Sequence, residues 1–253
     1  MVQPAKPERW SEGRVYALRQ WTDQLYSVQV EADTHPFTAG QFTKLGLPVE
    51  DSFVERAYSY VNAPDTQPLE FYFVVVPDGP LTHRMTTLKP GDPLWVMRKA
   101  SGFLTLGEVP EARHLWMLST GTAIGPFLSI LHTAEPWERF ERVVLVHAVR
   151  HARELSFGES IAALTSRHAD RFRFIPFVSR EQTDFALPGR VTTALGNRQL
   201  EVRAGIDIDP EHSQVMICGN PDMVKETSTL LQARGLERNR RRAPGHITVE
   251  NYW

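Results

Sequence analysis

The stretch LWMLSTGTAIGPF, residues 115–127, decides how the second half of this chain is expected to fold. A continuous apolar run is followed here by two glycines and a proline. Such a run ending in a turn predicts a buried parallel strand that leads into a helix, where backbone N–H groups form an anion site. The spacing of Gly121 and Gly125 is not the GxGxxG dinucleotide fingerprint. The turn alone therefore leaves a plain strand-to-helix connection equally open.

The same rhythm continues from about residue 112 to the C-terminus. Short apolar runs alternate with amphipathic stretches of helical length, which predicts a parallel sheet with crossover helices. The predicted strands are 114–119, 143–149, 172–178 and 214–218, with a final strand-like segment at 246–252.

The first hundred residues have a different pattern, in which turn formers separate short and often alternating segments. Strands are predicted at 15–21, 25–31, 41–47, 55–61, 69–76 and 93–99. Six such strands indicate a small antiparallel barrel, with one helix at 81–88 after Gly79 and Pro80. We therefore predict a β-barrel domain at 1–108 and a doubly wound α/β domain at 109–253.

Composition excludes several classes of protein. The net charge of -2 provides no broad basic field for nucleic acid. The single cysteine, Cys218, excludes an internal disulfide framework, a CxxC zinc site and a cysteine-ligated cluster, and no metal site is expected. No segment approaches the roughly 18 apolar residues of a membrane span. These features predict a cytoplasmic protein with no membrane partner.

Several further segments carry residue types suited to a nucleotide. Arg56 and Tyr58, in ERAYSYVNAP (55–64), share one strand face, where a guanidinium can clamp a pyrophosphate and a ring can stack on a heterocycle. Such a pair is also ordinary on protein surfaces. Arg180 and Arg190 lie beyond another predicted strand, where they suit a phosphate monoester.

The order of the motifs RAYS, GTAIGP, VSR, CGNP and a C-terminal VExY resembles the ferredoxin (or flavodoxin) NADP reductase family, closest to its bacterial type. The resemblance extends from about Arg14 to Trp253. It implies an FAD-binding barrel followed by an NADP-binding domain, with electrons passing between NADPH and ferredoxin or flavodoxin.

The resemblance also implies roles for residues of the barrel domain. Arg56 would hold the FAD pyrophosphate, Tyr58 would stack on the isoalloxazine, and Ser59 would hydrogen-bond near flavin N5. The remaining implied flavin contacts are Ala57, Tyr72, Phe73, Val74, Val75, Leu81, Thr82 and, at the flavin–nicotinamide junction, Thr122.

In the second domain, the resemblance implies that Arg180 and Arg190 read the 2′-phosphate of NADPH, with Arg150 as a third candidate. It also implies that Ser179 binds the cofactor. Cys218 and Glu250 match the pair near the nicotinamide and flavin N5, so Ser59, Cys218 and Glu250 form the implied catalytic set. From the residues alone, Cys218 would be a buried strand cysteine. Either Tyr252 or Trp253 would cover the flavin or stack on the adenine.

The run RNRRRAP (238–244) is either a solvated loop or a docking patch for an acidic carrier. We expect a monomer. Two alternatives stay open: a reductase of the same superfamily acting on free flavin, a ferric chelate or a quinone, and a non-catalytic flavin- or nucleotide-binding subunit.

Overall fold

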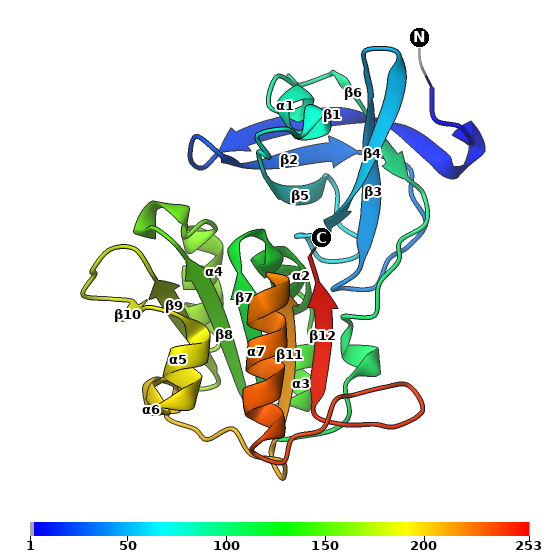
Figure 1. Ribbon diagram of the computed structural model, residues 1–253. Helices are drawn as coiled ribbons and strands as arrows, with labels where there is room; N and C mark the ends of the chain where they lie inside the picture. Colours follow the sequence, from blue (N-terminus) through cyan, green and yellow to red (C-terminus); the bar gives the residue numbers. More distant parts are fainter. Residues whose placement is uncertain (1–2, 253) are drawn as a thin grey trace. The chain divides into compact units, whose positions relative to one another are not determined.

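The computed structural model describes residues 3–252, which form two compact units (Figure 1). The barrel unit comprises Met1–Thr105 and Leu128–Thr133, and the sheet unit comprises Leu106–Phe127 and Ala134–Trp253. The division of function between 1–108 and 109–253 stays a prediction.

The barrel unit is built on one antiparallel sheet of six strands in the order β4-β3-β6-β1-β2-β5. A bridge between Tyr60 and Phe71 joins the two edges, so the sheet curls on itself. This confirms the predicted antiparallel barrel. The elements are β1 (Trp10–Gln20), β2 (Leu25–Glu31), β3 (Phe42–Val49), β4 (Ser52–Ser59), β5 (Leu69–Val74), α1 (Pro80–Met85) and β6 (Pro93–Met97), with a short η1 (Pro7–Arg9).

Strand β1 begins five residues before its predicted start at Val15. Its first residues pair with β6, with Trp10 opposite Met97 and Gly13 opposite Leu94. The polar sequence SEGR (11–14) has no alternation of apolar and polar residues that would predict a strand. Pairing with β6, which is distant in the chain, determines where β1 begins. A second difference concerns α1, which ends at Met85 rather than at 88.

The sheet unit holds six strands in the order β10-β9-β8-β7-β11-β12, and all of them are parallel. Its strands are β7 (His114–Thr120), β8 (Arg142–Val149), β9 (Phe172–Val178), β10 (Leu187–Pro188), β11 (Ser213–Gly219) and β12 (Ile247–Asn251). Its helices are η2 (Leu106–Glu108), η3 (Gly121–Ala123), α2 (Ile124–Leu131), α3 (Glu135–Arg139), η4 (Ala152–Glu154), α4 (Gly158–Arg167), α5 (Val191–Gly196), α6 (Gln199–Ala204) and α7 (Pro221–Gln232). The predicted doubly wound sheet is thereby confirmed, although the two-residue β10 was missed.

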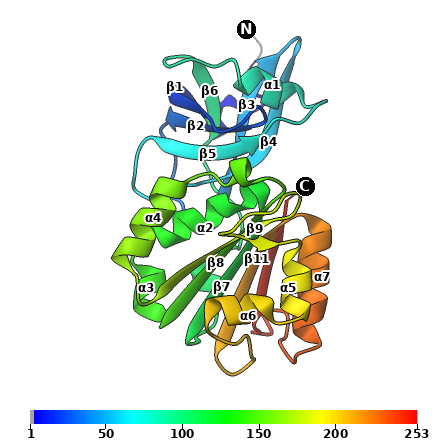
Figure 2. The ribbon, with the colours of Figure 1, turned by 90° about the vertical axis from the view of Figure 1, so that its left-hand side faces the viewer.

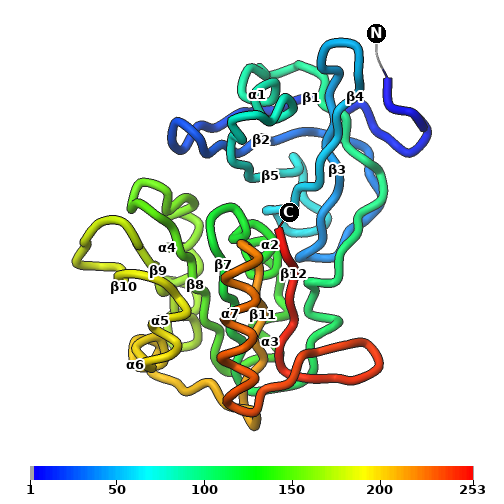
Figure 3. Tube along the Cα trace, in the orientation of Figure 1, coloured from blue at the N-terminus to red at the C-terminus, as the bar shows by residue number. Residues whose placement is uncertain are grey.

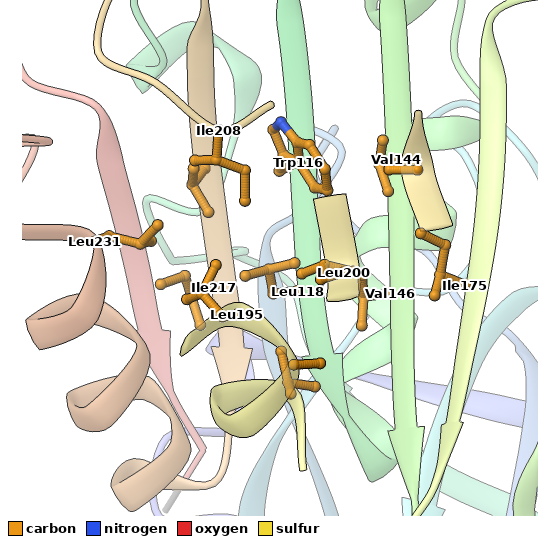
Figure 4. Packing of buried hydrophobic residues seen from close by; sticks show 14 of the residues in the cluster. Trp116, Leu118, Val144, Val146, Ile175, Leu195, Leu200, Ile208, Ile217 and Leu231 are labelled. Atoms are coloured by element: carbon orange, nitrogen blue, oxygen red, sulfur yellow. The ribbon is translucent and has the colours of Figure 1, made fainter. Parts of the chain in front are cut away.

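Helices lie on both faces of the parallel sheet, with α5, α6 and α7 on one side and α3 and α4 on the other (Figure 2). The strands are buried on both faces, which explains their continuous apolar runs. In the core beneath α5–α7, Trp116, Leu118 and Val146 from the sheet meet Leu195 and Leu200 from the helices (Figure 4). No helix within residues 3–252 is long and apolar enough to cross a membrane.

Candidate functional site

The order of strands in the parallel sheet reverses between β7 and β11. Strands β8, β9 and β10 follow β7 toward one edge, whereas β11 and β12 lie on its other side. In open α/β sheets, ligands bind beyond the carboxyl ends of the strands at such a switch point. Because β7 ends at Thr120 and β11 at Gly219, the turn at 121–125 lies at this position.

The two turns at the switch point are joined to each other. The backbone N–H of Asn220 donates to Thr120 Oγ1 over 3.0 Å. Gly219 has a φ of +137°, and a Cβ there would overlap Thr120 Oγ1, so only glycine permits this approach. Asn220 Oδ1 also accepts from the N–H groups of Asp222 and Met223, which caps α7. The turn after β11 is therefore held rigidly against the end of β7.

A buried histidine holds the other turn. The His147 ring, on β8 and 0% exposed, lies with Nε2 at 3.0 Å from the carbonyl of Gly121. A carbonyl only accepts, so Nε2 carries the proton and Nδ1 is unprotonated. Nδ1 is buried without a partner among the described residues, and burial lowers the pKa of His147 to about 4. Gly121 itself has a φ of +55° with open space where a side chain would point, which suits the approach of a ligand.

The predicted pair Cys218 and Glu250 is brought together on neighbouring strands. The two residues are in register between β11 and β12, and Cys218 faces Ser119 on the β7 side. Glu250 Oε1 is buried with no hydrogen-bond partner in residues 3–252, and burial raises the pKa of Glu250 to about 7. Burial, reinforced by the Glu250 charge, raises the pKa of the Cys218 thiol, which a hydrogen bond with Tyr252 partly offsets. Cys218 is thus a neutral thiol at neutral pH.

Tyr252 lies beside this pair, since its N–H also donates to the carbonyl of Gly219 over 3.0 Å. The other predicted C-terminal aromatic, Trp253, lies outside the described residues. Thr122, the residue predicted at the junction, is 8% exposed in η3, which lies against β7, β8 and β11.

The predicted phosphate readers follow the ends of β8 and β9. The N–H of Arg180 donates to the carbonyl of Arg150 over 2.9 Å, so the two chains continue side by side past their strands. Ser179 donates to the carbonyl of Val149 through both N–H and Oγ, each over 3.1 Å. This segment is fixed by main-chain bonds, which leaves the arginine side chains available.

Arg190 joins the same region through β10. The N–H of Gly189 donates to the carbonyl of Val178 over 3.2 Å, and Arg190 follows as the residue before α5. We refer to Arg150, Arg180 and Arg190 as the edge arginines. All three are exposed, and none of them forms an ion pair with another residue in the described part of the chain. Their charges are free to meet an anion.

In the barrel unit, the RAYS residues occupy the end of β4. Arg56 and Tyr58 share a face as predicted, opposite Leu45 and Thr43 of β3. Burial raises the pKa of Tyr58 to about 12, and the nearby charge of Arg56 acts in the opposite direction. Arg56 and Ala57 are exposed, whereas Ser59 is buried, with 6% of its surface accessible.

An aromatic cluster lies beside Tyr58. Its ring meets that of Phe73 on β5 edge-on, with centroids 6.2 Å apart, and Phe73 stacks on Tyr26 at 5.7 Å. Tyr72 is buried on the alternate face of β5, with its ring 6.5 Å from Trp21. The strand continues through Val74 and ends before Val75, both half-buried.

The turn before α1 presents the predicted N–H groups of Leu81 and Thr82. Thr82 Oγ1 accepts from the N–H of Val76 over 3.1 Å and donates to the carbonyl of Gly79 over 3.0 Å, which closes the turn. Pro80 is the first residue of the helix. The N–H groups of Leu81 and Thr82 therefore lie in the first turn, where helices supply no internal acceptor.

The arginine run at 238–242 lies at the other end of β12 from Glu250. Arg238 bridges Ile247, the first residue of β12, and the loop leads into that strand (Figure 3). Arg241 pairs with Glu108 at 2.9 Å. Four steps of about 3.3 Å along β12 separate its ends by about 13 Å. Docking at this run stays a prediction, and the run is remote from Cys218 and Glu250.

Sequence reasoning missed His147 and the contact between Thr120 and Gly219. A histidine inside the apolar run RVVLVHAV was a visible signal, because a buried polar side chain needs a partner. The Thr120–Gly219 contact had no local signal, since it joins strands about 100 residues apart.

Comparison with known proteins agrees with this architecture. The family model of the oxidoreductase NAD-binding domain matches residues 117–229. Flavodoxin/ferredoxin–NADP reductases of Shigella flexneri and Escherichia coli (strain K12) are each 48% identical to this chain over 245 residues, covering 96% of it and 99% of the relative. The crystal structure of a ferredoxin NADP+ reductase from Neisseria gonorrhoeae with bound FAD and NADP superimposes with a TM-score of 0.92 at 35% identity, covering 97% of this chain and 99% of that one.

Proposed function

The chain belongs to the flavodoxin/ferredoxin–NADP reductase family, and on this premise we propose how its own residues serve electron transfer between NADPH and a one-electron carrier, ferredoxin or flavodoxin. The protein is an FAD-dependent oxidoreductase. FAD, when bound, supplies the exchange between a two-electron hydride donor and a one-electron acceptor, and the protein supplies position and electrostatics.

The residues of the barrel unit fit FAD. Arg56 Nη1 donates to the carbonyl of the preceding residue, Glu55, over 2.7 Å. The remaining N–H donors of this guanidinium suit a pyrophosphate. Tyr58, backed edge-on by Phe73, offers a flat face for a flavin ring. The first-turn N–H groups of α1 add donors for the phosphates. We assign FAD to residues 1–108 on these grounds.

The edge arginines suit the 2′-phosphate that distinguishes NADPH from NADH. Three exposed guanidinium groups without carboxylate partners in the described chain can bind a phosphate monoester bidentately. They lie along the same strand ends as the Gly121 turn, so one dinucleotide along this edge would reach both. We assign NADPH to residues 109–253.

The pair Cys218 and Glu250 would position the nicotinamide. A neutral thiol packs against the nicotinamide ring without the cost of desolvating a charge of its own. Glu250, with its pKa near 7, changes between carboxylate and carboxylic acid close to neutral pH, so it can hold or release a proton at Oε1. Tyr252, hydrogen-bonded to Cys218, would lie over this site. In the barrel unit, Ser59 would hydrogen-bond near N5 of the bound flavin.

The register of Cys218 with Glu250 beside the Gly121 turn is the observation that carries this proposal. The test is an absorbance spectrum of the purified protein before and after anaerobic addition of NADPH and, separately, NADH. We expect a two-peaked flavin spectrum that bleaches much faster with NADPH. A protein that cannot be loaded with FAD, or that bleaches equally with both nucleotides, contradicts the assignment.

We further propose that the enzyme acts as a cytoplasmic monomer and accepts either ferredoxin or flavodoxin. Its single cysteine is buried, which suits a reducing compartment. Rates with ferredoxin, flavodoxin, free flavin and a ferric chelate identify the acceptor, and sedimentation of the FAD-loaded protein measures its oligomeric state.

A further inference from the structure

A second basic site lies at the amino-terminal ends of strands in the parallel sheet, opposite the ends that lead to the Gly121 turn. A pocket of about 220 Å³ opens between the starts of β8 and β9 and the end of α6. Four arginines line it: Arg142, Arg171, Arg173 and Arg203. We call this group the pocket arginines, and nothing in the reaction described above uses them.

Strand geometry places two of these arginines on one face. Arg173 of β9 is in register with Val144 of β8, so both side chains point to the same side of the sheet. Arg142 lies two positions before Val144 in β8 and therefore points to that side as well. Arg171 lies in the turn before β9 and also lines the pocket. Val144 packs in the core beneath α6, and Arg203 lies on α6 itself.

The end of α6 leaves this corner of the sheet open. The helix is six residues long and stops at Gly205, whose φ of +73° turns the chain away. Val202 on the rim of the pocket is 81% exposed. The pocket lies beside the end of this helix, next to the first residues of β8 and β9.

Each pocket guanidinium is held in place through one nitrogen. Arg142 donates to the carbonyl of Asp170, and Arg171 donates to the carbonyl of Phe140 over 2.6 Å. These two hydrogen bonds connect the loop before β8 with the loop before β9. The other two also donate to carbonyls, Arg173 to Ala169 at 2.7 Å and Phe172 at 3.1 Å, and Arg203 to Phe185 at 3.1 Å. Because a guanidinium has five N–H donors, most donors stay available in a nearly fixed orientation.

Carboxylates do not neutralise this group. No pocket arginine forms a salt bridge with any residue among 3–252, and the neighbouring acids are engaged elsewhere. These pairs are Glu141 with Arg113 at 2.8 Å, Asp207 with Arg198 at 2.6 Å, and Glu201 with Arg234 at 3.0 Å. Two further acids near these arginines along the chain, Glu138 and Asp170, form no salt bridge among residues 3–252, and the four arginines outnumber them. An excess of positive charge therefore stays at the pocket.

We propose that this pocket binds a small, multiply charged phosphate anion of about the size of pyrophosphate. Phosphate oxygens accept paired N–H donors from guanidinium groups, and pre-anchored arginines lose little freedom on binding. The volume is below the roughly 300 Å³ at which pockets for drug-sized ligands begin, so a dinucleotide does not fit. A concave, pre-anchored site favours a small anion over the flat face of a partner protein.

This site is separate from the proposed NADPH site. Arg142 begins β8 and Arg150 follows its end, eight residues along the chain. At about 3.3 Å per residue, the two basic groups lie about 26 Å apart. The inference therefore does not depend on the proposed function.

The test is calorimetric titration of the FAD-loaded protein with pyrophosphate, first without NADP+ and then with saturating NADP+, which would occupy the edge arginines. We compare the unmodified protein with R173Q/R203Q and with the control R238Q/R240Q, which removes two exposed arginines from the same edge of the sheet. We expect one saturable site, kept in the control and weakened about tenfold or more in R173Q/R203Q, the loss expected for charge-assisted hydrogen bonds.

Three results would overturn the proposal. They are equal affinity in R173Q/R203Q and the control, no saturable binding by the unmodified protein, and loss of binding when NADP+ is added. If R173Q/R203Q instead weakens binding of the carrier protein while pyrophosphate does not bind, the group is a docking surface and the small-anion proposal is wrong. If pyrophosphate does bind, titrations with inorganic phosphate and with a sugar phosphate distinguish a site for a free anion from a site for a phosphate ester.

Discussion

The buried His147 makes the stability of the sheet unit depend on pH in a calculable way. Its Nε2–H bonds the carbonyl of Gly121 at 3.0 Å, and its buried Nδ1 has no partner among the described residues. A second proton would place a charge in a site that offers no acceptor for it. The ordinary pKa of 6.5 therefore falls to about 4 in the folded protein.

The sign of the effect follows from proton binding. Below pH 6.5 the unfolded chain takes up a proton at His147 that the folded chain refuses, so acid favours unfolding. The contribution is fully present above pH 6.5 and is lost as the pH falls toward 4. A shift of about 2.5 units at about 1.4 kcal/mol per unit corresponds to a loss of about 3 kcal/mol.

The assay compares urea unfolding of the unmodified protein with that of H147Q at pH 7, 6, 5 and 4.5, followed by tryptophan fluorescence with FAD bound. Gln keeps an N–H that can reach Gly121 but has no proton to gain, so it removes only the titration. We expect the free energy of unfolding of the unmodified protein to fall more steeply than that of H147Q, by up to about 3 kcal/mol near pH 4. Parallel pH profiles of the two proteins, or an NMR titration of His147 with a midpoint near 6.5, would show that burial does not lower the pKa of His147.

Three further predictions concern the candidate site. Arg180→Ala should raise the KM for NADPH several-fold and leave NADH use nearly unchanged, because only NADPH carries the 2′-phosphate; equal losses in steady-state kinetics would contradict this assignment. Ser59→Val should slow flavin reduction by NADPH far more than it lowers FAD content, and an unchanged stopped-flow rate would show that Ser59 has no such role. Gly219→Ala should destabilise the protein by about 1–3 kcal/mol, because the new Cβ overlaps Thr120 Oγ1 in a left-handed backbone, and Thr120→Ala should restore part of that loss in thermal unfolding.

Local pattern was enough to predict most of the strands. The prediction for 172–178 matches β9 residue for residue, and 25–31 matches β2. In both segments, the order of apolar and polar residues indicates which faces of the strand are buried. This pattern lies within a single segment, so it can be read without knowing the rest of the fold. The GTAIGP turn and the RAYS segment were visible for the same reason, because special turns and paired side chains need particular residues in sequence.

Patterns within short segments were therefore enough to predict the fold class, the order of the two domains and the family. The contacts between distant segments became visible only in the fold: Thr120 against Gly219, His147 against Gly121, and Arg142 beside Arg173. These contacts depend on strand order and register, which are set by the packing of segments distant in the chain. Burial of a strand leaves a hydrophobic pattern within one segment, whereas strand pairing depends on two segments at once.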